Sequence, residues 1–351
     1  MSHLIVHAGF PKCGSTAIFA GLQQQFASLM AQNFLILNRS FEAAPTKNLA
    51  QPPLWEIESA VRNPPEAKAV KEKITKALKE AAPDANLILS SENLANRVMP
   101  KRLLQGIDEQ HQVTVIFYMR PQVSWIPSAW KQWDMREGIT LRATVEKYLE
   151  LQRPAYLSIV QAWEETMPNA KIILRPLVSS ELHEGDPIKD FYHQIGATFD
   201  TSVPPAPKSN LNPSIDHALM HLMMSDHSLF FKGRHDSTFM FRLLDFLPDT
   251  YKRTNAAMLS QLTSSEIFDT YYAENLILAR DYIHMDDPKG FLDRHFRHTV
   301  EGDPYETMSD DRVMARAESI VQEVFNISVP RNQLAKALFD AVETRSAQQA
   351  T

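Results

Sequence analysis

Four short apolar runs separated by helical patterns constrain the fold of this chain more than any other feature of its sequence. The runs span residues 4–8, 87–90, 113–119 and 171–174. Each is brief and bounded by polar or turn residues, which is typical of parallel strands that are buried on both faces. The helical patterns between them favour a central parallel sheet with helices on both faces over about the first 200 residues. We therefore predict a three-layer α/β fold.

The order of the patterns also predicts how the chain is divided. Within the first part, apolar spacing predicts helices at residues 15–30, 66–82, 151–167 and 187–195. A proline-rich stretch at residues 202–207 ends the alternation of strands and helices. Beyond it, helical spacing recurs at residues 215–224, 239–246, 264–283 and 310–325. We predict an α/β core over residues 1–202 and a mainly helical C-terminal extension, residues 203–351, that packs on it.

Charge and cysteine content exclude several classes of protein. The 351 residues include 42 Asp and Glu against 36 Lys and Arg, a net charge of -6, which argues against a globally basic nucleic-acid binder. Cys13 is the one cysteine, so no intramolecular disulfide can form. The apolar start is too short for a signal peptide, and no window approaches the ~20 apolar residues of a membrane span. The sequence predicts a cytoplasmic protein.

Residues 9–16, Gly-Phe-Pro-Lys-Cys-Gly-Ser-Thr, follow the first predicted strand and open the first predicted helix. A Walker A loop reads G-x-x-x-x-G-K-[ST] in the same context, and here both glycines and the final Thr16 match. Ser15 takes the place of the Walker lysine, and Lys12 lies inside the loop. Backbone N–H groups and a helix N-terminus still favour the binding of an anion, and the hydroxyls of Ser15 and Thr16 are further hydrogen-bond donors for it. The missing lysine argues against a nucleoside triphosphate, whose β- and γ-phosphates that residue contacts.

A second candidate for anion binding follows the predicted strand 113–119. Arg120 lies at the carboxyl end of that strand, where open parallel sheets bind ligands. Its guanidinium suits bidentate phosphate binding, although a surface ion pair is the common alternative. Ser128, eight residues later, adds a hydroxyl donor from the start of the next helix.

Together these two elements resemble the sulfotransferase family that uses 3′-phosphoadenosine 5′-phosphosulfate (PAPS). The family's phosphosulfate loop reads P-K-x-G-[ST]-[ST], as residues 11–16 do, and its 3′-phosphate motif pairs an arginine with a serine eight positions on, as Arg120 and Ser128 are spaced. Residues 172–176 and 185–191 weakly resemble its last core strand and the following helix. The resemblance covers about residues 1–200. It implies a P-loop-type α/β fold, PAPS as donor, adenosine 3′,5′-bisphosphate as product, and no bound metal.

The resemblance also implies residue roles in sulfuryl transfer. It assigns Lys12 to the leaving-group oxygen, and donor binding to Lys12, Cys13, Gly14, Ser15, Thr16, Arg120 and Ser128. Family members use a histidine or glutamate as base, and Glu92, at a carboxyl strand end, is our candidate. A helix-capping or ion-paired carboxylate is the alternative for Glu92. His7 is a rival base that we expect to face the packing of the sheet instead.

Weaker candidates lie elsewhere in the chain. Three tryptophans after Arg120 either stack on a ligand or pack in the core, with packing expected for at least two: Trp125, Trp130 and Trp133. Two short polar segments are weak candidates for contacts with the 3′-phosphate and with the acceptor, respectively residues 232–234 and 208–210. Two histidines have zinc-compatible spacing but no cysteine or acidic partner, so we expect no metal there: His217 and His221.

The sequence thus predicts a PAPS-dependent sulfotransferase with a small-molecule or glycan acceptor, a carbohydrate hydroxyl being favoured. A P-loop kinase or nucleotide hydrolase is the enzyme alternative and predicts magnesium-dependent turnover of ATP or GTP. A non-catalytic nucleotide-binding module is the third possibility. For Cys13, a helix N-terminus is expected to lower the thiol pKa, although we expect its backbone N–H to matter more.

Overall fold

The computed structural model describes residues 2–204, 215–252 and 257–349. The chain forms two compact units, each built from separate segments. The first unit comprises Met1–Pro121, Pro154–Leu211 and Tyr272–His295. The second comprises Gln122–Arg153, Asn212–Tyr271 and Phe296–Thr351.

This division differs from the predicted one at residue 202. Residues 122–153 group with the later helices, and residues 272–295 group with the first unit. The physical reason is that compact units are set by which segments pack together, and segments far apart in the sequence pack in each unit. A proline-rich stretch marks a change in local pattern and carries no information about such packing.

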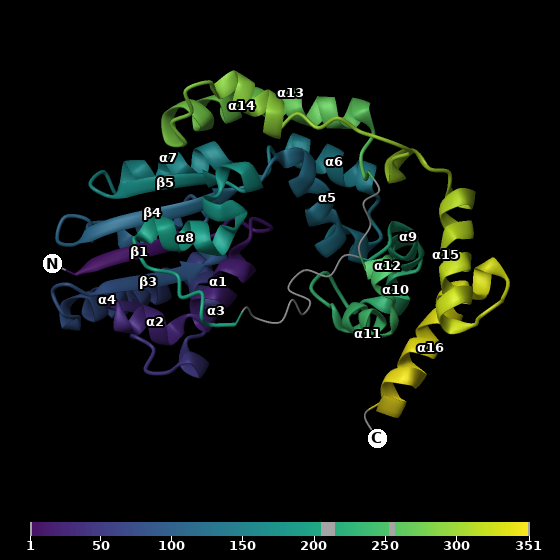
Figure 1. The fold of residues 1–351 in the computed structure, drawn as a ribbon, viewed down its shortest axis with the longest axis horizontal. Helices are drawn as coiled ribbons and strands as arrows, with labels where there is room; N and C mark the ends of the chain where they lie inside the picture. Colours follow the sequence, from purple (N-terminus) through teal and green to yellow (C-terminus); the bar gives the residue numbers. More distant parts are fainter. Residues whose placement is uncertain (1, 205–214, 253–256, 350–351) are drawn as a thin grey trace. The chain divides into compact units, whose positions relative to one another are not determined.

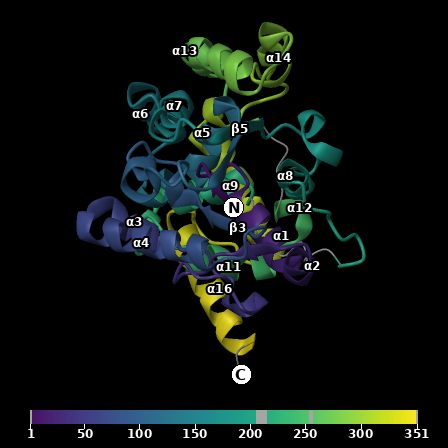
Figure 2. The ribbon, with the colours of Figure 1, turned by 90° about the vertical axis from the view of Figure 1, so that its left-hand side faces the viewer.

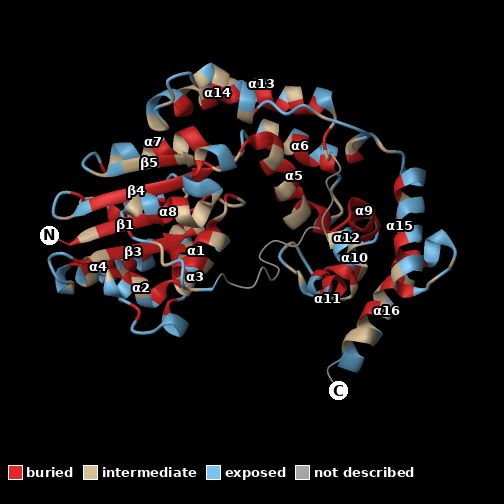
Figure 3. Cartoon of the chain, viewed as in Figure 1, coloured by how far each residue is buried: buried red, intermediate tan, exposed pale blue. Residues whose placement is uncertain are grey.

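The first unit holds an all-parallel sheet of five strands in the order β2-β3-β1-β4-β5 (Figure 1). The strands are β1 (His3–Ala8), β2 (Phe34–Ile36), β3 (Asn86–Ser91), β4 (Gln112–Met119) and β5 (Lys171–Pro176). The four predicted strands are confirmed, and β2 is an addition whose three residues are too few to show a pattern. The central strands β3, β1 and β4 are buried along most of their length (Figure 3).

Helices cover both faces of this sheet, as can be seen in Figure 2, which views the sheet along the direction of its strands. One face carries α1 (Ser15–Gln24), α2 (Phe26–Ala31) and α8 (Pro187–Ile195). The other carries α3 (Leu54–Arg62), α4 (Pro64–Glu80), the π-helical turn η3 (Pro100–Leu104) and α7 (Tyr156–Thr166). The predicted three-layer α/β architecture with a helical C-terminal region is therefore confirmed.

Local sequence signals explain the bounds of one helix of the first unit, α8, and two other predicted helices differ from their predicted ranges. The bounds of α8 are those predicted, because Asp186 caps its N-terminus, Pro187 occupies the first turn and Gly196 adopts the left-handed conformation after its end. The predicted helix at 15–30 is instead two helices, α1 and α2, interrupted at Gln25. The helix predicted at 151–167 begins later, at Tyr156.

Asp190 fastens α8 to the sheet. The Tyr118 hydroxyl of β4 donates to its carboxylate at 2.8 Å, and the Arg175 guanidinium of β5 lies at 2.7 Å. Burial alone would raise the pKa of Asp190, but hydrogen bonds from Arg175, the His183 N–H and Tyr118 outweigh burial and lower it. The segments that resemble the family's last strand and following helix are thus joined by one buried carboxylate.

The second unit is helical where it is described. Its helices are α5 (Gln122–Gln132), α6 (Leu141–Glu150), α9 (His217–Ser225), α10 (His227–Phe230), α11 (Thr238–Phe246), α12 (Asp249–Lys252), α15 (Asp310–Phe325) and α16 (Leu334–Gln349). Helix α13 (Gln261–Ile277) crosses the division between the units, and the turn η7 (Leu278–Tyr282) and α14 (Pro288–His295) belong to the first. Helices were predicted in four of these places, at α9, α11, α13 and α15, and a helix was expected directly after Arg120, where α5 lies. Helices α6, α10, α12, α14 and α16 were not predicted.

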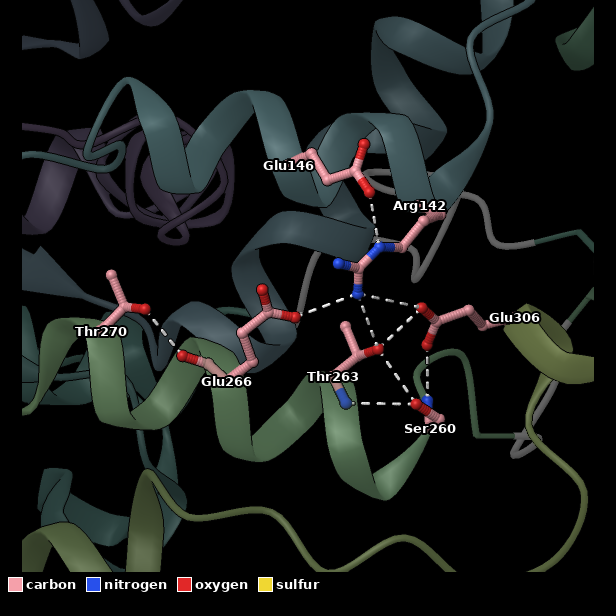
Figure 4. Close-up of polar contacts among 7 residues, drawn as sticks. All are labelled: Arg142, Glu146, Ser260, Thr263, Glu266, Thr270 and Glu306. Carbon is pink, nitrogen blue, oxygen red and sulfur yellow. Dashed lines mark hydrogen bonds and ion pairs between the residues drawn. The ribbon is translucent and has the colours of Figure 1, made fainter.

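A polar network joins α6 to the start of α13 within the second unit (Figure 4). Arg142 contacts Glu146 at 2.9 Å and Glu266 at 3.0 Å. Glu306, from the 3₁₀ turn η8 (Tyr305–Thr307), accepts hydrogen bonds from the Thr263 hydroxyl at 2.7 Å and the Ser260 N–H at 2.8 Å. Arg142 is exposed, so each of its ion pairs contributes little to the free energy of folding. Because Glu306 is bonded to both Ser260 and Thr263, the network connects α6, the start of α13 and η8.

Candidate functional site

The loop of residues 9–16 turns sharply between β1 and α1. Lys12 and Gly14 have left-handed backbone angles, with φ of 64° and 85°. The Cys13 N–H donates to the Phe10 carbonyl at 3.2 Å, which closes the turn. In the part of the chain that the structure describes, no side chain caps the α1 N-terminus and its first turn holds no acidic residue. This helix end therefore suits an anion.

Gly9 allows the loop to close against the end of β3. Its N–H donates to the Ser91 carbonyl at 3.2 Å. A Cβ at Gly9 would lie 2.1 Å from the Ser15 hydroxyl oxygen and 3.5 Å from the Cα of Glu92. Only glycine fits this approach, which brings the loop next to the residue predicted as the base.

Glu92 begins the 3₁₀ turn η2 (Glu92–Leu94) immediately after β3. Its side chain is half-buried, and this burial raises the pKa of its carboxyl group. The positive charge of Lys12 acts in the opposite direction and offsets part of that rise. The structure therefore brings the predicted base and the predicted leaving-group lysine within electrostatic reach of each other.

Cys13 corrects one expectation. Its side chain is fully buried, and burial raises the pKa of the thiol to about 12, although the Tyr156 hydroxyl and Arg120 both act to lower it. The prediction of a lowered pKa is wrong, because desolvation of the thiolate outweighs any stabilisation by the helix N-terminus. Cys13 is thus a buried packing residue of the loop whose thiol is harder to ionise than an exposed one.

Tyr156, at the start of α7, is a site residue that the sequence analysis missed. Its hydroxyl donates to the Arg120 carbonyl at 2.9 Å, lies 3.3 Å from the Arg120 N–H, and lies 3.4 Å from the Cys13 sulfur. Its ring packs edge-on against Phe10 with the centroids 4.7 Å apart. Tyr156 therefore ties the end of β4 to the loop. No local motif marks it, since only the fold brings it to residues more than 30 positions away.

Three strand ends thus converge in the first unit. Lys12 follows β1, Glu92 follows β3 and Arg120 follows β4, and β1 pairs with both of the other strands. All three side chains are half-buried. The charges of Arg120 and Glu92 both act on the Cys13 thiol, which places them around the loop. The structure therefore brings together the residues predicted for catalysis and part of those predicted for donor binding.

Ser128 belongs to the other compact unit. It lies half-buried in α5, whereas Arg120 is in the first unit. The predicted pairing of Arg120 and Ser128 around one phosphate therefore stays a prediction. Gly14, Ser15 and Thr16 lie at the start of α1 as predicted, with Ser15 buried and Thr16 exposed.

The tryptophans after Arg120 belong mainly to the core of the second unit. Trp125 and Trp130 are 4% and 0% exposed, which agrees with packing for at least two of the three. Trp133 is half-buried, and the Arg234 guanidinium lies 5.5 Å from its ring centroid and 3.7 Å from Asp134. Arg234 thus has structural partners in its own unit. Residues 208–210 lie outside the described residues.

Three histidines that the sequence analysis considered pack against other side chains of their own unit. His7 faces the packing of the sheet as expected: its ring lies against Phe191 of α8, its Nδ1 is 2.8 Å from the Ser90 hydroxyl, and burial lowers its pKa to about 3. His217 and His221 flank Tyr305 in the second unit. Over the described ranges, no three His, Cys, Asp or Glu side chains form a group suited to a metal ion.

Comparison with protein-family models and with curated proteins found no match to this sequence. The functional argument therefore depends on the residues themselves and on the motifs that they form. Across the described helices, none combines the length and apolar character needed to cross a membrane.

Proposed function

We propose that this chain is a sulfotransferase that moves a sulfuryl group from PAPS to an acceptor hydroxyl by in-line displacement, with a carbohydrate as the favoured acceptor. Two motifs support the proposal: residues 11–16, and Arg120 with Ser128. One structural observation carries it furthest, namely that Lys12, Glu92 and Arg120 follow neighbouring strand ends around a single loop. Parallel sheets bind ligands at this edge.

The proposed donor site uses the loop for the 5′-phosphosulfate. The uncapped N-terminus of α1 and the exposed Thr16 hydroxyl supply donors to its oxygens. Arg120 binds the 3′-phosphate through its guanidinium fork. The further hydroxyl donor that the motif assigns to Ser128 stays a prediction. The Walker lysine is not needed in such a site, because PAPS has no γ-phosphate.

In the proposed reaction, the acceptor oxygen attacks sulfur while its proton passes to the Glu92 carboxylate. The bond between sulfur and the bridging oxygen of the 5′-phosphate breaks, and its electron pair stays on that oxygen. Lys12 donates a hydrogen bond to this oxygen and so stabilises the charge that develops there. The products are a sulfate ester and adenosine 3′,5′-bisphosphate. Burial raises the pKa of Glu92 and so moves it toward neutral pH, where a general base is most effective.

Two other functions predict different results. A P-loop kinase or nucleotide hydrolase would turn over ATP or GTP with magnesium, and Ser15 in place of the Walker lysine argues against it. A non-catalytic module would bind the bisphosphate without transferring sulfuryl groups. The absence of a metal, the absence of a nucleic-acid partner and the cytoplasmic location stay predictions.

Transfer of radiolabelled sulfuryl groups from PAPS to a panel of carbohydrate, phenol and alcohol acceptors tests the proposal. We expect transfer by the wild type, no measurable transfer by Lys12→Ala, and full transfer by Lys68→Ala, whose lysine is exposed on α4. Labelled product from Lys12→Ala at the wild-type rate would contradict the role of Lys12. Turnover of ATP with magnesium, and none of PAPS, would favour the kinase alternative.

A further inference from the structure

The position of Glu92 depends on the short turn η2, which leaves the sheet directly after β3. On the side of the sheet this turn is held by the backbone. The Ser91 carbonyl accepts a hydrogen bond from the Gly9 N–H at 3.2 Å, and Ser91 pairs with Ala8 in the parallel register of β1 and β3. The Ala95 N–H donates to the Glu92 carbonyl at 3.3 Å and closes the turn. The inner side of η2 is thus fixed to the loop that follows β1.

The outer side of the same turn is held by a side chain, that of Asn93. Its amide donates to the Leu54 carbonyl at the start of α3, at 2.8 Å. The Asn93 N–H also donates to the Ser91 hydroxyl, at 3.4 Å, so this residue connects the end of β3 with α3. Asn93 directly follows Glu92, and both side chains are half-buried.

Helix α3 can serve as an anchor because it is itself held at several points. Ile57 and Ala60 are fully buried on its inner face. The Arg39 guanidinium donates to Glu56 at 2.8 Å, and the Arg102 guanidinium donates to the Ala60 carbonyl at 3.4 Å. A hydrogen bond to the first turn of α3 therefore ties η2 to a fixed part of the first unit.

We propose that Asn93 is a positioning residue for sulfuryl transfer: by tying η2 to α3, its amide keeps the Glu92 carboxylate in place beside the loop that carries Lys12. This inference rests on the proposed function and adds a residue to the same site. A general base must stay within hydrogen-bonding reach of the proton that it takes, and a displacement of about 1 Å can lower the rate about a hundred-fold. Because a glutamate side chain is long and flexible, movement of its turn adds to the movement of its carboxylate.

Steady-state transfer from PAPS, measured as a function of pH, tests this role. Asn93→Ala should lower kcat about ten-fold and leave the KM for PAPS unchanged, because it frees the base without altering the loop that follows β1. Burial raises the pKa of Glu92, so a carboxylate that gains access to water should move the acid limb of the kcat profile to lower pH. Asn93→Gln keeps an amide donor and should recover part of the kcat. Asn63→Ala removes another exposed amide bond, to Glu66 of α4, and should behave as the wild type does.

A double-mutant cycle in urea unfolding at pH 7 tests the same role without the donor. Glu92→Gln should stabilise the wild type, because the ionised, half-buried carboxylate costs stability. In the Asn93→Ala background this gain should be smaller, because the freed carboxylate already reaches water. Equal gains in the two backgrounds, or a kcat profile of Asn93→Ala with the acid limb of the wild type, would limit Asn93 to a structural role and overturn the inference. Should Asn93→Ala fail to fold, Asn93→Leu keeps the size of the side chain, removes the donor and takes its place in both experiments.

The proposed function and the role of Asn93 fail in different ways. If the wild type transfers no sulfuryl group while the unfolding cycle shows coupling, sulfuryl transfer is wrong and Asn93 still positions Glu92. If the wild type transfers sulfuryl groups and Asn93→Ala has the same kcat, only the role of Asn93 is wrong.

Discussion

Burial, more than position on a helix, sets the chemistry of individual residues at the candidate site. Cys13 lies at a helix N-terminus, where thiols often ionise readily, yet burial raises its pKa to about 12. Glu92 is half-buried, and its pKa rises for the same reason. In both residues burial disfavours the charged form, so the thiol is harder to ionise and the carboxylate holds a proton more readily.

Glu92→Gln should abolish sulfuryl transfer and stabilise the fold at neutral pH. The folded-state pKa of Glu92 is above its unfolded value of about 4.3, so the folded protein holds the proton more tightly. Above that pH the ionised carboxylate therefore costs stability, which glutamine removes. Urea unfolding at pH 7 and a transfer assay measure the two effects. Glu72→Gln, on the exposed surface of α4, should alter neither. Retained transfer in Glu92→Gln would show that another residue is the base.

Tyr156→Phe should weaken donor binding while leaving the core packed. Phenylalanine keeps the ring against Phe10 and removes the hydroxyl that contacts Arg120 and Cys13. We expect a loss of about 1–2 kcal/mol in unfolding free energy and about five-fold weaker binding of adenosine 3′,5′-bisphosphate, since Arg120 loses its support. Tyr282→Phe, which removes an exposed hydroxyl bonded to Glu164, should leave ligand affinity unchanged. Lower stability with wild-type affinity would limit Tyr156 to a structural role.

At the scale of elements, the sequence predicted what depends on local pattern and missed what depends on packing. Long buried strands such as β4 are visible as apolar runs, whereas the three residues of β2 are not. Lys12, Glu92 and Arg120 could be predicted together because the carboxyl ends of parallel strands share one edge. Tyr156 could not be predicted, since it contacts Arg120 and Cys13 from the start of α7, and only the fold brings these residues together. The burial of Cys13 likewise arises only from the assembled fold.

Asp190→Asn should destabilise the first unit more than any surface change of the same kind. Asparagine removes the charge that pairs with Arg175, while Arg175 remains mostly buried. We expect a loss of about 2–4 kcal/mol in the unfolding free energy at pH 7. Because the folded-state pKa of Asp190 is lowered, its contribution is present above the unfolded pKa and is lost as the pH falls through the folded one.

Urea unfolding as a function of pH measures this contribution. The difference between Asp190→Asn and wild type should shrink in acid, where the native aspartate is itself protonated. Asp249→Asn, with a side chain that is 98% exposed, serves as the control and should match the wild type. A difference that stays constant down to acid pH would mean that packing, rather than charge, accounts for the effect.

At the scale of the whole molecule, neither compact unit is one continuous stretch of the chain, because segments of the two units alternate along the sequence. The loop, Glu92 and Arg120 belong to the first unit, and Ser128 to the second, although Ser128 follows Arg120 by only eight residues. A boundary read from a proline-rich stretch cannot show this, because each unit joins segments that are far apart in the sequence. The first unit by itself carries the three charged residues on which the proposed chemistry depends.

Calorimetric titration of the full chain with adenosine 3′,5′-bisphosphate tests the central claim most directly. The wild type should bind the ligand without added metal. Arg120→Ala and Lys12→Ala should each weaken binding at least about ten-fold, as loss of a charge-assisted contact to phosphate predicts. Arg62→Ala, at an exposed arginine of α3, should bind as the wild type does. No measurable binding at high micromolar ligand, or equal affinity in all four proteins, would contradict the account.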